Sequence, residues 1–270
     1  MPSGSVSERR RAPARPAPRA PQKGDWRKRQ ASPRVLIAAG AAIVLIVLAV
    51  VLAVVLGGRS SNSQSGVPAL GSLVNGLPGS AAAYVLFEGV PQHGDVLGSP
   101  SAPVTMVEFV DPQCPYCGQF ETQVLPTIVQ RFVRTGRVRI KLEAWAFIGA
   151  DSARGQAAEL AAAEQNRMFD YTEVLYANQR TENTGWLSDG MVAAIAESIP
   201  GLRVHALLQA RGSAVVQAAQ KQVAEAVTAA GVDQTPTIFV GRTGTQGAQV
   251  AMASATDSAS LIAAINSVLG

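Results

Sequence analysis

Residues 104–117 read VTMVEFVDPQCPYC, and this stretch carries the main expectation for the fold. Its first half, residues 104–110, is a short run of β-branched and aromatic residues that predicts a strand. Its second half ends in Cys114-Pro115-Tyr116-Cys117, where we expect a helix to begin, because proline is favoured at the first helical position. The stretch therefore predicts a strand leading directly into a helix, with two cysteines at the junction.

Cys114 and Cys117 are the only cysteines in the chain. One helical turn separates them, so their Cβ atoms should lie about 5–6 Å apart, close enough for a disulfide to form and open. A bridge across so short a loop constrains little of the unfolded chain and would be a poor structural staple. The spacing therefore indicates redox chemistry.

The two cysteines are expected to play unequal parts. At the N-cap, the sulfur of Cys114 would face the free N–H groups of Tyr116 and Cys117, which favour a thiolate. We expect Cys114 to be the nucleophile and Cys117, one turn inside the helix, to be the more buried resolving thiol. Asp111 would oppose thiolate formation if its carboxylate pointed inward.

Outward from this stretch, the pattern alternates between strands and helices. Residues 84–90 predict an earlier strand, and residues 137–147 predict a later one. Between the cysteines and that later strand, Phe120, Val124, Ile128 and Phe132 fall on one helical face, and Pro126 should kink the helix.

The second half of the chain is expected to hold a helical block at about residues 151–230. We expect one segment to hold Leu160 and Leu175, a second to begin with Ser188 as N-cap, and a third to end at Gly231. Residues 237–240 and 249–252 then predict a hairpin, and residues 257–269 a closing helix.

The amino-terminal part has a different composition. Ten of the 23 Lys and Arg residues precede residue 35, against two acids, so the net charge of +4 reflects a basic tail. We interpret residues 1–34 as a disordered cytoplasmic tail and not as a surface for nucleic acid. Residues 35–56, from Val35 to Leu56, are uncharged and apolar and predict one transmembrane helix.

The charges beside this apolar run predict its orientation. Because the cations precede it, the amino terminus should stay in the cytoplasm and the rest of the chain should lie outside. A cleaved signal peptide is the alternative, but its apolar region is usually about 7–15 residues long. Residues 57–83 are rich in Gly, Ser, Asn and Pro and predict a flexible linker to a domain at residues 84–270.

The strand, the Cys-Pro-Tyr-Cys sequence, the long helical stretch and the later Thr235-Pro236-Thr237 resemble the DsbA-like branch of the thioredoxin superfamily. The resemblance covers roughly residues 84–270. It implies an α/β thioredoxin-like fold with a helical insertion at about residues 151–230. It also implies a membrane-anchored thiol–disulfide oxidoreductase.

The resemblance assigns further site residues. It implies a cis proline at Pro236, with the residue before it, Thr235, binding an extended substrate peptide. Pro115 and Tyr116, between the cysteines, are expected to contact the same peptide. Glu108 stands six positions before Cys114, where the family has a buried acid that assists proton transfer at the second cysteine.

We therefore expect the chain to exchange its disulfide with reduced secreted or envelope proteins, most simply as an oxidase that a membrane partner, such as a quinone-linked protein, re-oxidises. A reductase, an isomerase, or a tethered peptide-binding scaffold with an inert bridge are the alternatives. No cofactor is expected beyond the cysteine pair. His93 and His205 lie too far from the cysteines in sequence to predict a metal site, and copper delivery would require another cysteine spacing. Trp145, Trp186, Tyr171 and Tyr176 are expected in the core or lining a groove.

Overall fold

The computed structural model describes residues 69–270. The predicted tail, the predicted membrane span at residues 35–56 and the first part of the predicted linker lie outside these residues. Among the helices from residue 69 onward, none combines the length and the apolar character that crossing a membrane requires.

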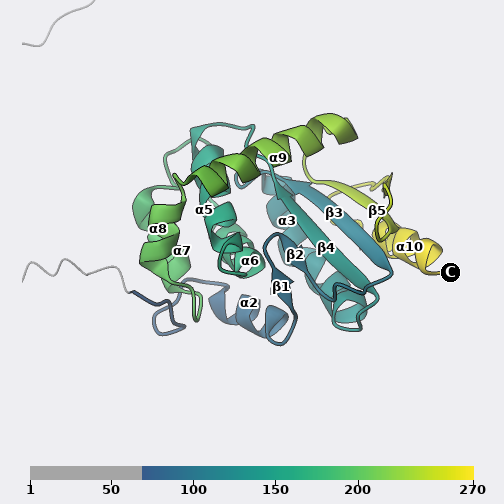
Figure 1. Ribbon diagram of the computed structural model, residues 1–270, viewed down its shortest axis with the longest axis horizontal. Coiled ribbons are helices and arrows are strands. Elements are labelled where there is room, and N and C mark those ends of the chain that lie inside the picture. The colour runs from purple at the N-terminus through teal and green to yellow at the C-terminus, as the bar shows by residue number, and fades with distance from the viewer. Residues whose placement is uncertain (1–68) are drawn as a thin grey trace, which may run out of the picture. The chain divides into compact units, whose positions relative to one another are not determined.

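One mixed sheet forms the centre of the described region (Figure 1). Its strand order is β1-β2-β4-β3-β5-β6, and β3 is parallel to β4 but antiparallel to β5. The strands are β1 (Gln92–His93), β2 (Val96–Leu97), β3 (Val104–Val110), β4 (Val138–Ala144), β5 (Thr237–Arg242) and β6 (Ala248–Gln249). The predicted strand at residues 104–110, the strand that follows the cysteines and the hairpin near the carboxyl terminus are thus confirmed.

The helices fall into groups around this sheet. The helices are α2 (Ser80–Phe87), α3 (Pro115–Gln123), α4 (Leu125–Ile128), the π-helix η1 (Val129–Val133), α5 (Ala150–Ala163), α6 (Met168–Ala177), α7 (Asp189–Glu197), α8 (Val204–Ala210), α9 (Ala214–Ala230) and α10 (Ser258–Leu269). Figure 1 shows α5 to α9 following β4 and leading back to β5. This confirms the predicted helical block, although α8 was not predicted.

The two faces of the sheet carry separate apolar clusters because side chains alternate along a strand. On β3, Met106 and Val110 point into the larger cluster, which also holds both cysteines and the buried sides of α3, α5, α6 and α10. Phe109 points the other way, into a smaller cluster with Val223 and Val227 of α9. Helices therefore cover both faces of β3.

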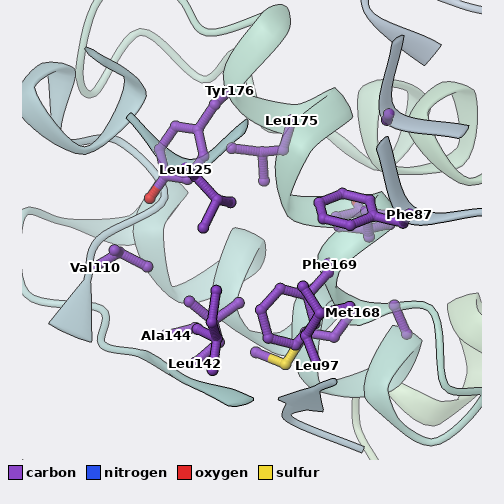
Figure 2. Close-up of a cluster of buried hydrophobic side chains, with 14 of the residues drawn as sticks. Phe87, Leu97, Val110, Leu125, Leu142, Ala144, Met168, Phe169, Leu175 and Tyr176 are labelled. Atoms are coloured by element: carbon purple, nitrogen blue, oxygen red, sulfur yellow. The ribbon is translucent and has the colours of Figure 1, made fainter. Parts of the chain in front are cut away.

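Side chains of α6 fill the space over the face of the sheet that carries the larger cluster, as Figure 2 shows. Met168 and Phe169 lie beside Leu97 of β2, and Phe87 of α2 meets Phe169 edge-on with ring centroids 6.2 Å apart. Further along α6, Tyr176 and Leu175 lie beside Leu125 (Figure 2). Helix α6 thereby packs against α4, which directly follows the helix that carries the cysteines.

The predicted strand at residues 84–90 is wrong, because these residues belong largely to α2. The helix begins at Ser80 and includes three alanines, the residue with the highest helix propensity, which the predicted boundary left out. Ala83, Leu86 and Phe87 are buried while Val85 is exposed, which is the helical and not the alternating pattern.

The folded domain also begins earlier than residue 84. The N–H of Gly71 donates to the carbonyl oxygen of Leu202 at 2.8 Å, and the N–H of Ser72 donates to that of Glu197 at 2.7 Å. The N–H of Leu77 donates to the Ser198 hydroxyl at 2.8 Å. These bonds attach the described end of the predicted linker to the α7–α8 region.

Several local signals were confirmed and one was incomplete. The Ser188 hydroxyl accepts from the Met191 N–H, and Gly231 follows α9 with a φ of 67°. The helix after the cysteines breaks beside Pro126, between α3 and α4. The segment predicted around Leu160 is two helices, because the chain turns at Asn166 with a φ of 57°.

Candidate active site

Cys114 occupies the N-cap of α3, as the sequence predicts. Its φ and ψ of −65° and 119° are extended, and Pro115 follows at the first helical position. The side chain is nearly buried, with 5% of its surface exposed, whereas Tyr116 is 59% exposed. The Cys114 thiol donates to the carbonyl oxygen of Thr235 at 3.3 Å, across 121 residues of sequence.

This position lowers the pKa of Cys114 from its ordinary value of 9.0 to about 6. The largest cause is a hydrogen bond from the Cys117 side chain, and the backbone N–H groups of Cys117 and Tyr116 act in the same direction, against the effect of burial. Hydrogen bonds to an anionic sulfur favour the thiolate. Near pH 7 the geometry therefore favours a thiolate at Cys114.

Cys117 lies one turn further along α3 and has no exposed surface. Burial raises its pKa well above the ordinary value, and the hydrogen bond and charge of Cys114 act in the same direction. Both cysteines are free thiols in this structure. One cysteine is thus held in a state suited to nucleophilic attack, and its partner in a state that retains a proton.

The loop at Thr235 and Pro236 lies against the cysteines, and the peptide bond between the two residues is cis, as the resemblance implied. An open groove of about 180 Å³ lies between this loop and the start of α3. It is lined by Tyr116, Gln234, Thr235, Pro236, Met252, Ser254 and Ala255. Three of the four residues expected to bind substrate therefore line one groove; Pro115 is exposed beside it.

Glu108 points into the core face of the sheet and has no exposed surface. Its neighbours in register are Leu142 of β4 and Ile238 of β5, and neither carboxylate oxygen has a hydrogen-bond partner. Burial raises its pKa from 4.5 to about 8, and the charge of Glu173 adds to the effect. At neutral pH, Glu108 therefore keeps a proton.

The carboxylate of Asp111 accepts several hydrogen bonds from the loops around the site. It accepts from the N–H groups of Gln113 at 2.7 Å and Phe147 at 2.8 Å, and from the Ser152 hydroxyl at 2.6 Å. These bonds tie the loop before Cys114 to the loop after β4 and to the start of α5. Asp111 therefore stabilises the loop before Cys114, a role that its sequence position alone did not indicate.

Helix α6 and the segment directly after it supply two further contacts that the sequence did not reveal. The Tyr176 hydroxyl donates to the carbonyl oxygen of Asp111 at 2.8 Å, and the Gln179 amide donates to that of Cys114 at 3.1 Å. The insertion thus holds the backbone on both sides of the nucleophile. Their sequence distance of 65 residues left no local signal.

Apart from Tyr176, the other candidates take no part in the site. His93 and His205 are exposed, on β1 and α8. Tyr171, Tyr176 and Trp186 are buried, and the half-buried Trp145 stacks on Phe147 with ring centroids 4.3 Å apart. Within residues 69–270, no group of His, Cys, Asp and Glu side chains is arranged to hold a metal ion.

Curated relatives carry names related to disulfide chemistry. The chain is 31% identical over 112 residues to the probable disulfide bond formation protein D of Bacillus cereus, covering 40% of this chain and 52% of that protein. It is 26% identical over 147 residues to the disulfide bond formation protein D of Bacillus subtilis (strain 168), covering 54% and 66%. The chain thus spans about half to two thirds of the length of these relatives.

Solved structures share the fold. BdbD from Bacillus subtilis, in its oxidised form, superposes with a TM-score of 0.58 at 22% identity, over 67% of this chain and 97% of that one. DsbA from Chlamydia trachomatis gives 0.55 at 22%, over 64% and 90%. These likenesses confirm the expected thioredoxin-like α/β fold with a helical insertion.

A family model described as Thioredoxin matches residues 92–257, which is well over half of the chain. The match includes β3, both cysteines, the whole insertion and the Thr235–Pro236 loop. This chain therefore belongs to the thioredoxin family.

Proposed function

We propose that this protein is a thiol–disulfide oxidoreductase that passes its Cys114–Cys117 disulfide to reduced secreted or envelope proteins. The observation that carries the proposal is the unequal pair at the start of α3, with an N-cap thiol whose pKa is lowered to about 6 beside a fully buried partner. An inert bridge would need neither the lowered pKa nor the adjoining groove.

The roles follow from these positions. A substrate thiolate attacks the Cys114 sulfur of the oxidised protein, the bond between the two sulfurs breaks, and the electron pair goes to Cys117, which takes a proton from Glu108. A second substrate thiolate then attacks the substrate sulfur of this mixed disulfide, which forms the substrate disulfide and releases Cys114 as a stable thiolate. Thr235 and Pro236 line the groove in which the peptide would lie.

The direction of exchange follows from the stability of the reduced form. A lowered pKa at Cys114 stabilises the reduced form, in which Cys114 is a thiolate at neutral pH, so the disulfide is a good oxidant. The names of the Bacillus relatives are consistent with this direction. A partner that re-oxidises the cysteines would complete the cycle.

We also propose that residues 35–56 anchor the chain in the cell membrane, with residues 1–34 in the cytoplasm and the thioredoxin domain outside. The apolar run and the preceding cations support this orientation. A membrane-impermeant maleimide should then label reduced Cys114 in intact cells without lysis. Labelling only after lysis would contradict the proposed location.

The test of the activity uses the full chain and a model peptide with two reduced cysteines. The oxidised protein should form the peptide disulfide, and Cys114→Ser should abolish the exchange. Cys117→Ser keeps only the Cys114 thiol and should accumulate a mixed disulfide when it is mixed with a disulfide-linked dimer of a one-cysteine peptide, because the Cys114 thiolate displaces one peptide thiolate. The double variant is the control and should trap nothing. Absence of exchange by the wild-type protein would refute the activity.

A redox titration against glutathione decides the direction. We expect a potential nearer to that of strong oxidants, about −120 mV, than to that of thioredoxin, about −270 mV. A value at the reducing end would support a reductase instead.

A further inference from the structure

Four buried glutamates lie on the cysteine side of the sheet. Glu108 comes from β3, Glu121 from α3, Glu159 from α5 and Glu173 from α6, and their exposed fractions are 0%, 1%, 0% and 8%. Each has at least one carboxylate oxygen without a hydrogen-bond partner. Among the ion pairs of residues 69–270, none involves any of the four.

Such an arrangement is costly for ordinary structure, because an ionised carboxylate without a partner is strongly disfavoured in a protein interior. The described residues also provide no metal-binding group that would account for them. Their positions relative to Cys117 offer a chemical reason.

Cys117 and Glu121 are four residues apart on α3 and therefore lie on the same side of the helix. Glu108 has the same orientation on β3 as Val110, toward the core cluster that contains Cys117. Both carboxyls thus face the layer in which the second thiol is buried.

Glu173 enters this layer from α6, three residues before Tyr176 on the same helix. Tyr176 is anchored beside the cysteines by its bond to the carbonyl of Asp111, and Figure 2 shows it next to Leu125, on the helix that continues from α3. Glu159 of α5 accepts a hydrogen bond from the Thr172 hydroxyl at 2.9 Å. Glu173 has the largest exposed fraction of the four, 8%, and is therefore the member nearest to solvent.

The charges of these groups influence one another. The pKa of Glu121 is raised first by burial and then by Glu108, Glu173 and Glu159. Glu173 raises the pKa of Glu108, and the pKa of Glu173 itself is raised by burial to about 7. The charged groups that face this layer are thus carboxyls and the thiols, together with Tyr176, whose pKa is raised by burial and by Cys117.

We propose that Glu173 joins Glu108 in a shared proton store for Cys117, which exchanges protons with water at Glu173. The inference rests on the proposed function. When a thiolate breaks the bond between the sulfurs, the electron pair goes to Cys117, the proton comes from Glu108, and water refills the store through Glu173. On re-oxidation the proton returns the same way. Glu173 acts through Glu108 and is a positioning residue.

The test is the pH profile of the reductive half-reaction. The full chain, oxidised, is mixed with dithiothreitol, and the rate is divided by the thiolate fraction of the reagent. A proton donor gives this corrected rate an alkaline limb as it ionises. Removing the charge of Glu173 should lower the pKa of the donor, because the charge of Glu173 raises it.

We expect the limb to move to lower pH by on the order of 1 unit in Glu173→Gln. Glu173→Asp keeps the charge and should restore the limb. The matched control is Glu143→Gln, which changes a buried glutamate of β4 whose partner is Lys141. A limb that coincides with the wild type in Glu173→Gln, or an equal shift in the control, would overturn the proposal.

A second measurement does not depend on exchange. The infrared band of buried carboxylic acids is titrated in the full chain, oxidised and after reduction by a phosphine. Its midpoint should differ between the two states and fall in Glu173→Gln. If the wild type exchanges no disulfide, the proposed function fails, while this titration still shows whether the buried carboxyls share protons. Exchange with an unshifted titration refutes the proton store alone.

Discussion

Replacing Cys117 by alanine should raise the pKa of Cys114, because the Cys117 side chain is the largest cause of its lowered value. The backbone N–H groups at the start of α3 remain in the variant and continue to favour the thiolate. The new pKa should therefore lie between about 6 and the ordinary 9.0. Cys117→Ser keeps a hydrogen-bond donor at the same position and should change the value less.

The size of the effect follows from the titration equilibrium. With a pKa of about 6, Cys114 is roughly half thiolate at pH 6 and about 90% thiolate at pH 7. We expect the alanine variant to lose at least about 1 unit of the lowering, which reduces the thiolate at pH 6 to about 10% or less.

The assay is a titration of thiolate absorbance in the reduced full chain. Cys117→Ala leaves Cys114 as the only cysteine, so the signal belongs to one group. In the wild type, Cys117 should ionise in a separate step at much higher pH, since burial raises its pKa. Alkylation by iodoacetamide at pH 6 gives an independent measure, and its rate should fall at least about fivefold in the alanine variant.

An unchanged midpoint in the alanine variant would show that the helix N-terminus alone determines the pKa of Cys114. Equal midpoints in the alanine and serine variants would show that the hydrogen bond from residue 117 has no part in it. Either result would refute the assigned cause.

Three further predictions concern stability. The pKa of Glu108 is about 8 in the folded chain against an ordinary 4.5, so between these two values only the folded state keeps the proton. The free energy of unfolding should therefore fall as pH rises from about 4.5 to about 8. Glu108→Gln should remove this fall and stabilise the chain by roughly 3 kcal/mol at pH 7, measured by urea unfolding. Ser188→Ala removes the N-cap of α7 and should cost about 1 kcal/mol in the same assay, and no loss would contradict the capping bond. Gly155→Ala should cost about 1–3 kcal/mol, because its Cβ would lie 2.6 Å from the Pro112 Cβ. Gly190→Ala, whose Cβ would lie 3.8 Å from the Ser188 hydroxyl, should be neutral or stabilising in thermal unfolding.

The strand and helix at residues 104–117 could be predicted from the sequence because their signals are local. The β-branched run, the proline after Cys114 and the four-residue spacing of Phe120 and Val124 each report on neighbours within one or two turns. The same reasoning found the N-cap at Ser188. It failed at residues 84–90, where the apolar residues suited either structure and the preceding alanines decided for a helix.

The sequence by itself determined the chemical type of the site: two cysteines one turn apart, the outer one at a helix start and the inner one in the helix body. Tertiary structure decided how reactive each thiol is. The Thr235 carbonyl reaches Cys114 across 121 residues, and the helical insertion places Glu173 and Tyr176 in the layer beneath Cys117. Burial and hydrogen bonding set the pKa of each group, and both depend on which distant segments pack together, a property that no local pattern encodes.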